Sequence, residues 1–298
     1  MVEKSGSPEP EKEFIMLKNL QDTYTLSNGV KMPGLGLGVW KVEDEAELIS
    51  AVHAAIDNGY IAIDTATAYD NEQFVGKAVE TCGKKREDLF ITTKLWNAHH
   101  QYDEALRAFD RSCEKLKTDY VDLYLIHWPT PAYDDYVEAW KALIHLYEEK
   151  RVRAIGVCNF KPHHLERVYK ETGIMPMVDQ VECHPLNQQL ELLDYCKKNG
   201  IVMEAYSPLL SGNLADVSDK LEAIAKKHGK TAAQVCIRFQ IERGVIVIPK
   251  SVHSNRIVEN ANVFDFALDE EDMAAIAALN QDHHFLPDPD TANFGKKR

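Results

Sequence analysis

Short apolar runs alternate with longer amphipathic stretches along most of this chain. Eight such runs occur, at residues 35–38, 61–64, 89–94, 121–127, 154–158, 177–182, 201–206 and 245–249. Their brevity and nearly continuous apolar character are typical of strands buried on both faces, as in a parallel sheet. Between them apolar residues recur at helical spacing, for example at Leu48, Val52 and Ile56 and again at Tyr136 and Trp140. This spacing predicts amphipathic helices between the strands.

The order of these elements predicts the fold class. Eight buried strands, each followed by a helix and with no change of composition midway, are typical of an α/β protein with a (β/α)8 TIM barrel. Before the first run, the Asn28-Gly29 dipeptide separates two short segments, 24–26 and 30–32, and predicts an N-terminal β-hairpin. The longest gap, between residues 206 and 245, predicts two helices and a Ser-Gly-Asn loop at 211–213 that is long enough to form a flap.

An open, doubly wound sheet is the alternative architecture. Its dinucleotide-binding fingerprint, G-x-G-x-x-G, would follow the first strand and open a helix. Here Gly34-Leu-Gly36-Leu-Gly38-Val39 lacks the last glycine, and no helical pattern follows at once. We therefore interpret these glycines as positions where the backbone of the first strand packs closely.

The N-terminal end differs in composition from this repeating region. Residues 1–22 are rich in Pro, Ser and charge, which predicts a disordered tail. Residues 23–298 are interpreted as one barrel domain, because α/β barrels often reach this length as a single domain. The start of the chain lacks the cationic and then apolar order of a signal peptide, and no apolar run approaches the roughly 18 residues of a membrane span.

Charge and cysteine content narrow the partners and the compartment. The net charge of −13 argues against nucleic acid or an anionic membrane as a partner, because both require a concentrated cationic face. Any bound phosphate must therefore be held by a local cluster of cations. The six cysteines lack C-x-x-C spacing and lie mostly in apolar segments, which is typical of reduced thiols in a cytoplasmic protein. We expect a monomer that acts on a small molecule.

Polar side chains occur where the apolar strands end. The carboxyl ends of the strands in a parallel barrel meet at one rim, which is where active sites of this fold lie. The residues at these ends, or in the loop just beyond, are Asp64, Tyr69, Lys94, His127, Asn159, Gln180, Glu182, Tyr206, Ser207, Lys250 and Ser251. The sequence therefore predicts a polar site on this rim.

Four of these residues form the chemistry of a proton donor. Taken singly, Lys94 and His127 are more often a structural ion pair and a hydrogen-bonded core group, and Asp64 and Tyr69 a helix cap and a packed ring. Taken together on one rim they suggest another role. An unperturbed tyrosine has a pKa of about 10, and a neighbouring cation lowers that pKa by favouring the phenolate. Asp64 would keep Lys94 charged, and His127 would orient a substrate carbonyl.

The sequence resembles the aldo-keto reductase family from about Tyr24 to Phe294. The blocks that carry the resemblance are Gly59-Tyr60 through Asp64-Thr65-Ala66 with Glu72 and Gly76, Thr92-Thr-Lys94-Leu-Trp96, Leu125-Ile-His127-Trp-Pro129, Ile155-Gly-Val-Cys-Asn-Phe160, and Ile248-Pro-Lys250-Ser251 with Arg256 and Glu259-Asn260. The resemblance implies NADPH-dependent reduction of aldehydes and ketones on a (β/α)8 barrel. It implies that Tyr69 is the general acid and that Lys94, Asp64 and His127 support it.

The resemblance also implies a set of residues that bind NADPH. Tyr206 resembles the platform under the nicotinamide ring, with Ser207 beside it, and Asn159 and Gln180 resemble the pair that holds its carboxamide. The 2′-phosphate would bind Lys250, Ser251 and Arg256, and the adenosine end Glu259 and Asn260. A cluster of two cations and a hydroxyl suits a phosphate. A helix cap at Ser251 with Arg256 on the helix surface is the alternative interpretation of the same residues.

Two positions depart from the family pattern. Cys158 stands where the family most often has Ser before Asn159, and a thiol is a weaker hydrogen-bonding group. A contact between Cys158 and the carboxamide is therefore left open. Ile61 stands where Arg is common, which affects local pairing and leaves the chemistry unchanged.

The substrate side of the site is expected to be aromatic. Trp40, Trp96 and Trp128 fall where the family lines its pocket, beside His127, although three tryptophans equally suit a core. Residues that would form loops over the mouth are Asn97, His99 and segment 285–290. The stretches 128–140 and 287–290 are similar to the branch of the family that holds microbial 2,5-diketo-D-gluconate and methylglyoxal reductases and protozoan prostaglandin F synthases. Small aldehydes and ketones such as 2,5-diketo-D-gluconate or methylglyoxal follow as expected substrates.

Two other functions remain open on the sequence. A metal-dependent barrel hydrolase is suggested by the pairs His99-His100, His163-His164 and His283-His284. No H-E-x-x-H motif or cysteine spacing accompanies these pairs, so we expect no metal site. A cofactor-binding redox-sensor subunit on the same fold is the second alternative. It would carry additional docking segments, and the sequence shows only a short polar tail.

Overall fold

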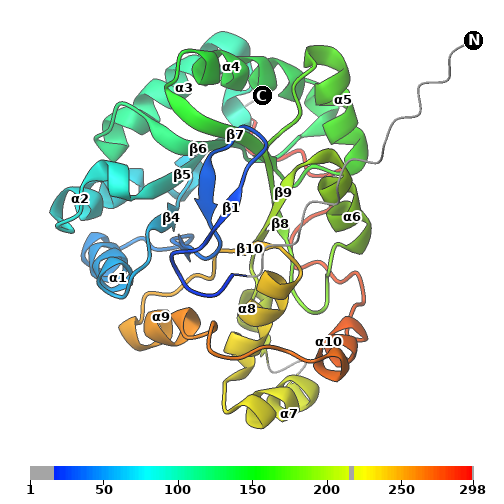
Figure 1. Ribbon diagram of the computed structural model, residues 1–298. Coiled ribbons are helices and arrows are strands. Elements are labelled where there is room, and N and C mark those ends of the chain that lie inside the picture. The colour runs from blue at the N-terminus through cyan, green and yellow to red at the C-terminus, as the bar shows by residue number, and fades with distance from the viewer. Residues whose placement is uncertain (1–16, 215–217, 297–298) are drawn as a thin grey trace, which may run out of the picture.

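A parallel sheet curled into a barrel forms the centre of the computed structural model, which describes residues 17–214 and 218–296 (Figure 1). Eight strands follow one another in chain order, and each pairs in parallel with the next. They are β3 (Leu37–Gly38), β4 (Ala62–Asp64), β5 (Phe90–Leu95), β6 (Val121–Ile126), β7 (Val152–Cys158), β8 (Val178–Glu182), β9 (Val202–Tyr206) and β10 (Ile246–Val247). All eight lie within or across the predicted apolar runs, so the predicted barrel is confirmed.

The barrel closes where the first strand meets the last. Leu35 bridges Val247 in parallel, and the backbone N–H of Gly36 donates to the Val247 carbonyl over 2.9 Å. A Cβ at Gly36 would lie 3.0 Å from the Cβ of Ala62, and one at Gly38 would lie 3.0 Å from the Ile248 carbonyl oxygen. These glycines therefore serve close backbone packing, as the sequence predicted, and no dinucleotide fingerprint is needed to explain them.

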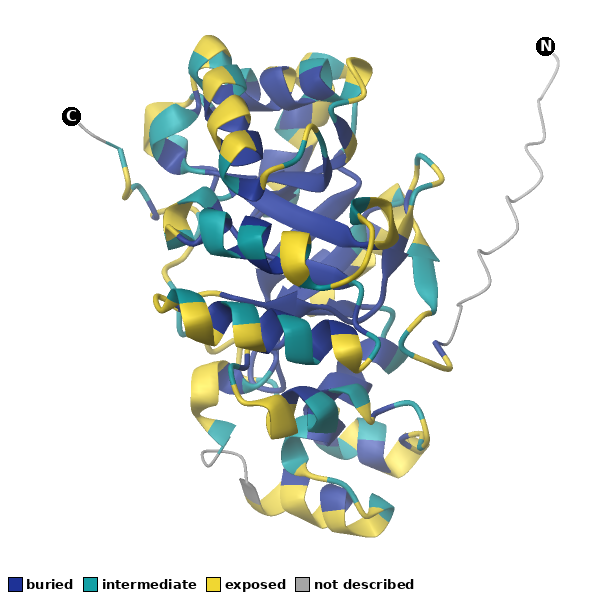
Figure 2. Ribbon diagram, turned by 90° about the vertical axis from the view of Figure 1, so that its left-hand side faces the viewer, coloured by how far each residue is buried: buried dark blue, intermediate teal, exposed yellow. Residues whose placement is uncertain are grey.

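Helices surround the barrel and bury one face each. They are α1 (Glu45–Asp57), α2 (Glu72–Thr81), α3 (Tyr102–Leu116), α4 (Tyr136–Glu148), α5 (Pro162–Thr172), α6 (Leu190–Asn199), α7 (Ser218–His228), α8 (Ala232–Glu242), α9 (Ser254–Ala261) and α10 (Glu270–Ala277). The strands of the barrel are largely buried and most helices turn exposed residues outward, whereas α8 is buried along most of its length (Figure 2). In α1 the predicted stripe of Leu48, Val52 and Ile56 is buried, and Asp44 caps the helix by accepting from the Glu47 N–H. Helices α7 and α8 are the two predicted in the long gap, and the loop before them makes a short turn, Leu210–Gly212.

The N-terminal hairpin covers the end of the barrel away from the predicted site. Strands β1 (Thr23–Thr25) and β2 (Lys31–Pro33) are antiparallel, which confirms the hairpin predicted from Asn28-Gly29. The Asn28 side chain donates to the carbonyl of Arg153, near the start of β7. Residues 1–16 of the predicted tail lie outside the described residues. Its last part, 17–22, packs on the barrel, with Leu17 buried in the core.

The helices are too short or too polar for a lipid bilayer. Within residues 17–214 and 218–296, none of them combines the length and apolar character that crossing a membrane requires.

Candidate active site

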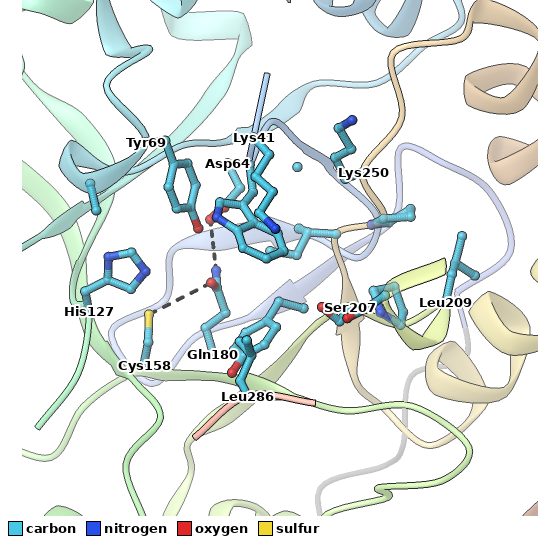
Figure 3. Close-up of a pocket in the computed structure, with 18 of the residues that line it drawn as sticks. Lys41, Asp64, Tyr69, His127, Cys158, Gln180, Ser207, Leu209, Lys250 and Leu286 are labelled. Atoms are coloured by element: carbon cyan, nitrogen blue, oxygen red, sulfur yellow. Dashed lines mark hydrogen bonds between the residues drawn. The ribbon is translucent and has the colours of Figure 1, made fainter. Parts of the chain in front are cut away.

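The carboxyl ends of the strands open into a cavity of about 780 Å³. Its wall contains most of the residues predicted from the strand ends, and Figure 3 shows Asp64, Tyr69, His127 and Gln180 turned toward it. The predicted residues that line it are Trp40, Asp64, Tyr69, Trp96, His127, Trp128, Asn159, Gln180, Tyr206, Ser207, Lys250, Ser251 and Arg256. Lys94 lies directly beneath them, fully buried. The fold therefore brings residues from eight separate stretches of sequence to one rim.

A buried ion pair lies at the base of the cavity. The Lys94 ammonium donates to Asp64 Oδ1 over 2.5 Å and to the Thr65 carbonyl over 2.9 Å. Its third contact is the phenol oxygen of Tyr69, 3.3 Å from Lys94 Nζ. Lysine carries three N–H donors, so all three are used within the protein. The ammonium is thereby fixed against the tyrosine hydroxyl.

The electrostatic balance at Tyr69 differs in part from the sequence-based expectation. Burial by itself lowers the pKa of Lys94, but Asp64 raises it above its ordinary value, so this side chain stays charged. Burial raises the pKa of Tyr69 to about 12, and Lys94 acts in the opposite direction without outweighing it. The expected direction of the cation's effect is correct, but the expected net fall of the pKa is wrong, because desolvation of the phenolate is the larger effect. Tyr69 is therefore protonated at neutral pH.

His127 is neutral and can donate toward the cavity. Burial, followed by the nearby Lys94 charge, holds the pKa of His127 well below its usual range. Its Nδ1 is buried and has no hydrogen-bond partner among the described residues. A proton on that nitrogen would be an unsatisfied buried donor, which is costly. The favoured tautomer therefore carries its proton on Nε2, and the ring stands edge-on to Tyr69 with 5.7 Å between centroids.

Buried polar side chains fix the loop that carries Tyr69. Tyr69 ends a short 3₁₀ turn, Thr67–Tyr69, between β4 and α2. The Asn71 amide donates to the carbonyls of Val39 and Val42 and accepts from the Thr65 hydroxyl over 2.7 Å. Glu72, at the start of α2, accepts from the Thr93 hydroxyl over 2.7 Å. The tyrosine is thus held by its flanking residues as well as by Lys94.

Three amide and phenol groups form the side of the cavity opposite Tyr69. Asn159 has a left-handed backbone, with φ 62°, and its side chain donates to the His127 carbonyl and accepts from the Tyr206 hydroxyl over 2.7 Å. Gln180 donates from Nε2 to Asp64 Oδ2 over 2.9 Å (Figure 3). Its Oε1 receives only a weak S–H contact from Cys158, with the sulfur 3.9 Å away. The Gln180 carbonyl oxygen therefore retains capacity to accept a hydrogen bond from a ligand.

Cations gather at the other end of the cavity. Lys250 and Arg256 line it, and so does Lys41, which was not among the predicted site residues. All three side chains are exposed, and none has a carboxylate partner within the described residues. Ser251 accepts from the His253 N–H over 3.2 Å, so it also shapes the turn before α9. In a chain of net charge −13, unpaired cations in one hollow suit an anionic ligand.

Glu259 and Asn260 lie outside the cavity wall. Both are on α9, where Glu259 accepts from the Thr231 hydroxyl over 2.8 Å and Asn260 is buried. The structure thus places them behind the cationic end, and their predicted contact with a ligand stays a prediction.

Aromatic rings enclose the end of the cavity nearest Tyr69 and His127. Trp40, Trp96 and Trp128 line it, and Trp128 is also buried, whereas Trp140 is buried in the core outside the cavity wall. Phe294 completes the wall, with its ring centroid 5.1 Å from that of Trp128 and 6.0 Å from that of Trp96. A Cβ at Gly295 would lie 2.4 Å from Trp96, which explains why glycine follows Phe294.

The C-terminal segment crosses the rim and is fastened at several loops. Glu182 accepts from the backbone N–H groups of Phe285 and Leu286 over 2.8 and 3.1 Å. Lys161, after β7, pairs with Asp288 over 2.6 Å. The Asn97 side chain donates to the Phe294 carbonyl over 3.0 Å. Asn97 therefore supports the mouth without lining it, and His99 instead pairs with Glu104. Leu286 and Pro287 are brought into the cavity wall.

One group within residues 17–214 and 218–296 has the spacing of metal ligands, namely His163, His164 and Asp290. His164 Nδ1 accepts from the backbone N–H of Lys161 over 3.1 Å, so its proton lies on Nε2, the nitrogen that faces Asp290. The ammonium of Lys161 is 2.7 Å from the other oxygen of Asp290. Metal coordination would have to break both arrangements, and none of these residues lines the cavity. We interpret the group as polar contacts that hold the C-terminal segment in place.

Sequence reasoning missed several residues of the site. Lys41 was missed because it lies just beyond the first strand, in a left-handed conformation with φ 58°. No local sequence pattern predicts that conformation. Leu209 lies in the loop after β9, and His253 lies in the loop before α9. The position of Lys41 directly after Trp40, a predicted rim residue, was the one available signal.

Comparison with known proteins identifies the family. The family model for the aldo/keto reductase family matches residues 34–281. The chain is similar to the glyoxal reductase of Bacillus subtilis, with 51% identity over 94% of this chain and 100% of the relative. It is also similar to the 9,11-endoperoxide prostaglandin H2 reductase of Trypanosoma cruzi, with 52% identity over 89% of this chain and 94% of the relative.

A solved structure extends the likeness to three dimensions. The structure of a Gox0644 mutant in complex with NADPH matches with a TM-score of 0.88 and 43% identity, over 92% of this chain and 99% of its own length. The barrel, the ion pair beneath Tyr69 and the family match agree with one another. This chain belongs to the aldo/keto reductase family.

Proposed function

We propose that this protein reduces small aldehydes and ketones to alcohols with NADPH, and that Tyr69 is the general acid. The observation that carries the proposal is the contact of the Tyr69 hydroxyl with Lys94, 3.3 Å apart, above an ion pair with Asp64. This array opens into a cavity whose far end holds unpaired cations. A proton donor and an anion-binding end in one cavity fit a reductase that uses a phosphorylated dinucleotide.

The residues of the cavity fit the cofactor. Lys250, Ser251 and Arg256 would supply charged and hydroxyl donors for a 2′-phosphate, and Glu259 and Asn260, which lie behind them on α9, would bind the adenosine end. Asn159 and Gln180 would bind the carboxamide, the second through its available carbonyl oxygen. Tyr206 would support the nicotinamide ring, with Ser207 beside it. When bound, NADPH supplies the hydride for the carbonyl carbon.

The protein side of the reaction is a proton transfer. Tyr69, with a pKa raised to about 12, stays protonated at neutral pH and is still more acidic than an alcohol, so it can protonate a developing alkoxide. Lys94 then stabilises the phenolate that is left. His127, neutral and with its proton on Nε2, would orient the carbonyl oxygen by donating to it.

The substrate end of the cavity favours small carbonyl compounds. Its wall is formed by Trp40, Trp96, Trp128 and Phe294, and its polar groups are Tyr69 and His127. Methylglyoxal fits this description, and the similarity to a glyoxal reductase supports a dicarbonyl. A diketo sugar acid such as 2,5-diketo-D-gluconate is the alternative substrate.

An assay of NADPH consumption tests the proposal. Purified protein is given NADPH with methylglyoxal, glyoxal or 2,5-diketo-D-gluconate, with and without a chelator. We expect chelator-insensitive oxidation of NADPH. Binding of NADPH without turnover of any carbonyl would instead favour a redox-sensor subunit, and loss of activity with the chelator a metal enzyme.

The setting of the enzyme is a further part of the proposal. All six cysteines are free, which fits the reducing cytoplasm. We propose a cytoplasmic monomer, and the mass measured in solution by light scattering would reveal a dimer.

A further inference from the structure

Glu204 is a buried acidic residue that the mechanism above does not use. It lies on β9, is 1% exposed and is the register neighbour of Gln180 on β8. Its Oε2 accepts a hydrogen bond from Gln180 Nε2 over 2.7 Å. Burying a carboxyl group is costly, and an apolar side chain of similar size would fill the space without that cost. Packing alone therefore gives no reason for glutamate here.

Glu204 and Asp64 together determine how the Gln180 amide is turned. The two N–H bonds of Gln180 point to Glu204 Oε2 and to Asp64 Oδ2, 2.7 and 2.9 Å away. Turning the amide over would bring its carbonyl oxygen against these two acidic oxygens. The carbonyl oxygen is thereby kept on the cavity side, where its protein contact is the weak one from Cys158 (Figure 3). Without Glu204, one N–H of Gln180 would lose its partner and the amide could rotate.

The same bonds connect Gln180 to the proton donor. Asp64 accepts from Gln180 through Oδ2 and from Lys94 through Oδ1, and Lys94 contacts the Tyr69 hydroxyl. A continuous series of hydrogen bonds thus runs from Glu204 to Tyr69 across the barrel interior. We propose that Glu204 is a positioning residue of the reductase: through Gln180 it orients the group that receives the nicotinamide carboxamide and joins that group to the Asp64–Lys94 pair. This inference rests on the function proposed above.

Because Glu204 can ionise, the inference predicts that turnover depends on pH. Burial, and then the charge of Asp64, raise the pKa of Glu204 to about 8, while the Gln180 bond and Lys94 act against this rise. The groups that face it are Asp64 on β4, Lys94 on β5, Cys158 on β7 and Gln180 on β8. Burial raises the pKa of the Cys158 thiol well above its ordinary value, so that group stays protonated near pH 8.

Ionised Glu204 would oppose the proton transfer. It adds a second negative charge beside Asp64, and this charge disfavours the phenolate that Tyr69 leaves after donating its proton. Among Glu204, Lys94, Tyr69 and Cys158, only Glu204 has a pKa that falls near 8. Turnover should therefore decline as the pH rises through about 8.

The test uses two substitutions at this site and one matched control. Glu204→Met removes the acceptor at nearly constant size, and Glu204→Gln removes the charge but keeps an oxygen that can accept from Gln180. Asp179→Asn is the control. Asp179, on β8, is a fully buried acidic residue like Glu204, but it has no bond to Gln180 in the described structure. The probes are NADPH and its reduced 3-acetylpyridine analogue, which has a methyl ketone in place of the carboxamide.

Binding is measured by quenching of tryptophan fluorescence, and kcat with methylglyoxal is measured from pH 6 to 10. The native protein should bind the analogue roughly two- to tenfold more weakly than NADPH, the effect of one lost hydrogen bond. Glu204→Met should bring this ratio close to one. Glu204→Gln should keep the ratio but lose the decline of kcat near pH 8. Asp179→Asn should change neither.

Several results would overturn the inference. These are an unchanged binding ratio in Glu204→Met, a persistent decline near pH 8 in Glu204→Gln, or a ratio of one in the native protein. If Glu204→Met fails to fold, as judged by circular dichroism, the pH profile of Glu204→Gln decides. If the native protein oxidises no NADPH, the proposed reductase function fails, and the binding ratios still test the orientation of Gln180 by Glu204.

Discussion

In the proposed mechanism, Tyr69 donates a proton without an unusually low pKa. A free phenol and a buried phenol both keep their proton at neutral pH, and burial here raises the pKa of Tyr69 to about 12. Lys94 contributes by stabilising the phenolate after the proton has left, because its charge is held by Asp64 and does not titrate in this range. The proposal that Tyr69 is the donor therefore rests on its contact with Lys94 and its place in the cavity more than on the pKa of its resting phenol.

Replacing Tyr69 by Phe tests this donor directly. The substitution removes one oxygen and keeps the ring, so NADPH should still bind with an affinity within about threefold of the native value. General acid catalysis contributes about 10² to 10⁴ in rate, so kcat for methylglyoxal should fall by that factor. Fluorescence titration and steady-state kinetics measure the two quantities. An unchanged kcat would remove Tyr69 from the mechanism.

Substitutions of Lys250 and Arg256 test the predicted phosphate site. A hydrogen bond to a charged group contributes about 1.5–3 kcal/mol, so Lys250→Ala or Arg256→Ala should raise KM for NADPH by about tenfold or more. KM for NADH, which lacks the 2′-phosphate, should change little. Lys170→Ala on α5 serves as the control, because that exposed lysine lies outside the cavity wall. Equal effects on the two cofactors would mean that the phosphate is bound elsewhere.

At the scale of elements, sequence predicted the strands that position the site, as well as the N-terminal hairpin and helices such as α1, α7 and α8. The apolar runs of the strands are nearly continuous because both faces are buried, and most runs end where a polar side chain reaches the rim, as at Asp64 and His127. The rule that barrel strands end on one rim then placed Tyr69 and Lys94 together before any contact was known. The predicted residues meet because the strands are parallel and follow chain order.

The path of the C-terminal segment could not be predicted in the same way. It has no periodic pattern, and its course depends on partners at the ends of separate strands, including Glu182 at the end of β8, Lys161 after β7 and Asn97 after β5. Each of these contacts joins residues about a hundred or more positions apart. Sequence reasoning therefore named segment 285–290 as a loop over the mouth but missed Phe294 as part of the aromatic wall.

Glu204 was missed for a related reason. It lies inside an apolar run, residues 201–206, whose last residue, Tyr206, drew attention to the rim. The alternation of side chains along a strand predicts on which face of the sheet a residue lies. It does not predict which residue lies opposite it across the barrel. The bridge from Glu204 through Gln180 to Asp64 became visible only when the curvature of the sheet brought β4 and β8 opposite each other.

For the whole molecule, buried titratable groups make the free energy of unfolding depend on pH. Some of these groups lower it in acid, and others lower it as the pH rises. Burial above all lowers the pKa of His99, His100, His127 and His164, the last to about 4. The unfolded chain then binds more protons than the folded one, so these groups destabilise the fold in acid, and their effect ends above about pH 6.5, the ordinary histidine pKa. Glu204 has the opposite sign, because its folded pKa is raised.

Above pH 6.5 the histidine effect has ended, and Glu204 should lower stability as the pH rises, in the same direction as Asp179, whose pKa burial also raises. The unfolded glutamate has already lost its proton there, whereas the folded one keeps it up to a pKa of about 8. The folded state thus binds one more proton, and stability falls with a slope of about 1.4 kcal/mol per pH unit, or about 2 kcal/mol between pH 6.5 and 8. Urea unfolding followed by circular dichroism at pH 6.5, 7.5 and 8.5 measures this decline. Glu204→Gln should make the decline between pH 6.5 and 8 smaller by about 2 kcal/mol, while Glu191→Gln, at an exposed position on α6, should leave it unchanged. A decline of the same size in Glu204→Gln would mean that another buried group, such as Asp179, causes it, because burial also raises the pKa of Asp179 well above its ordinary value.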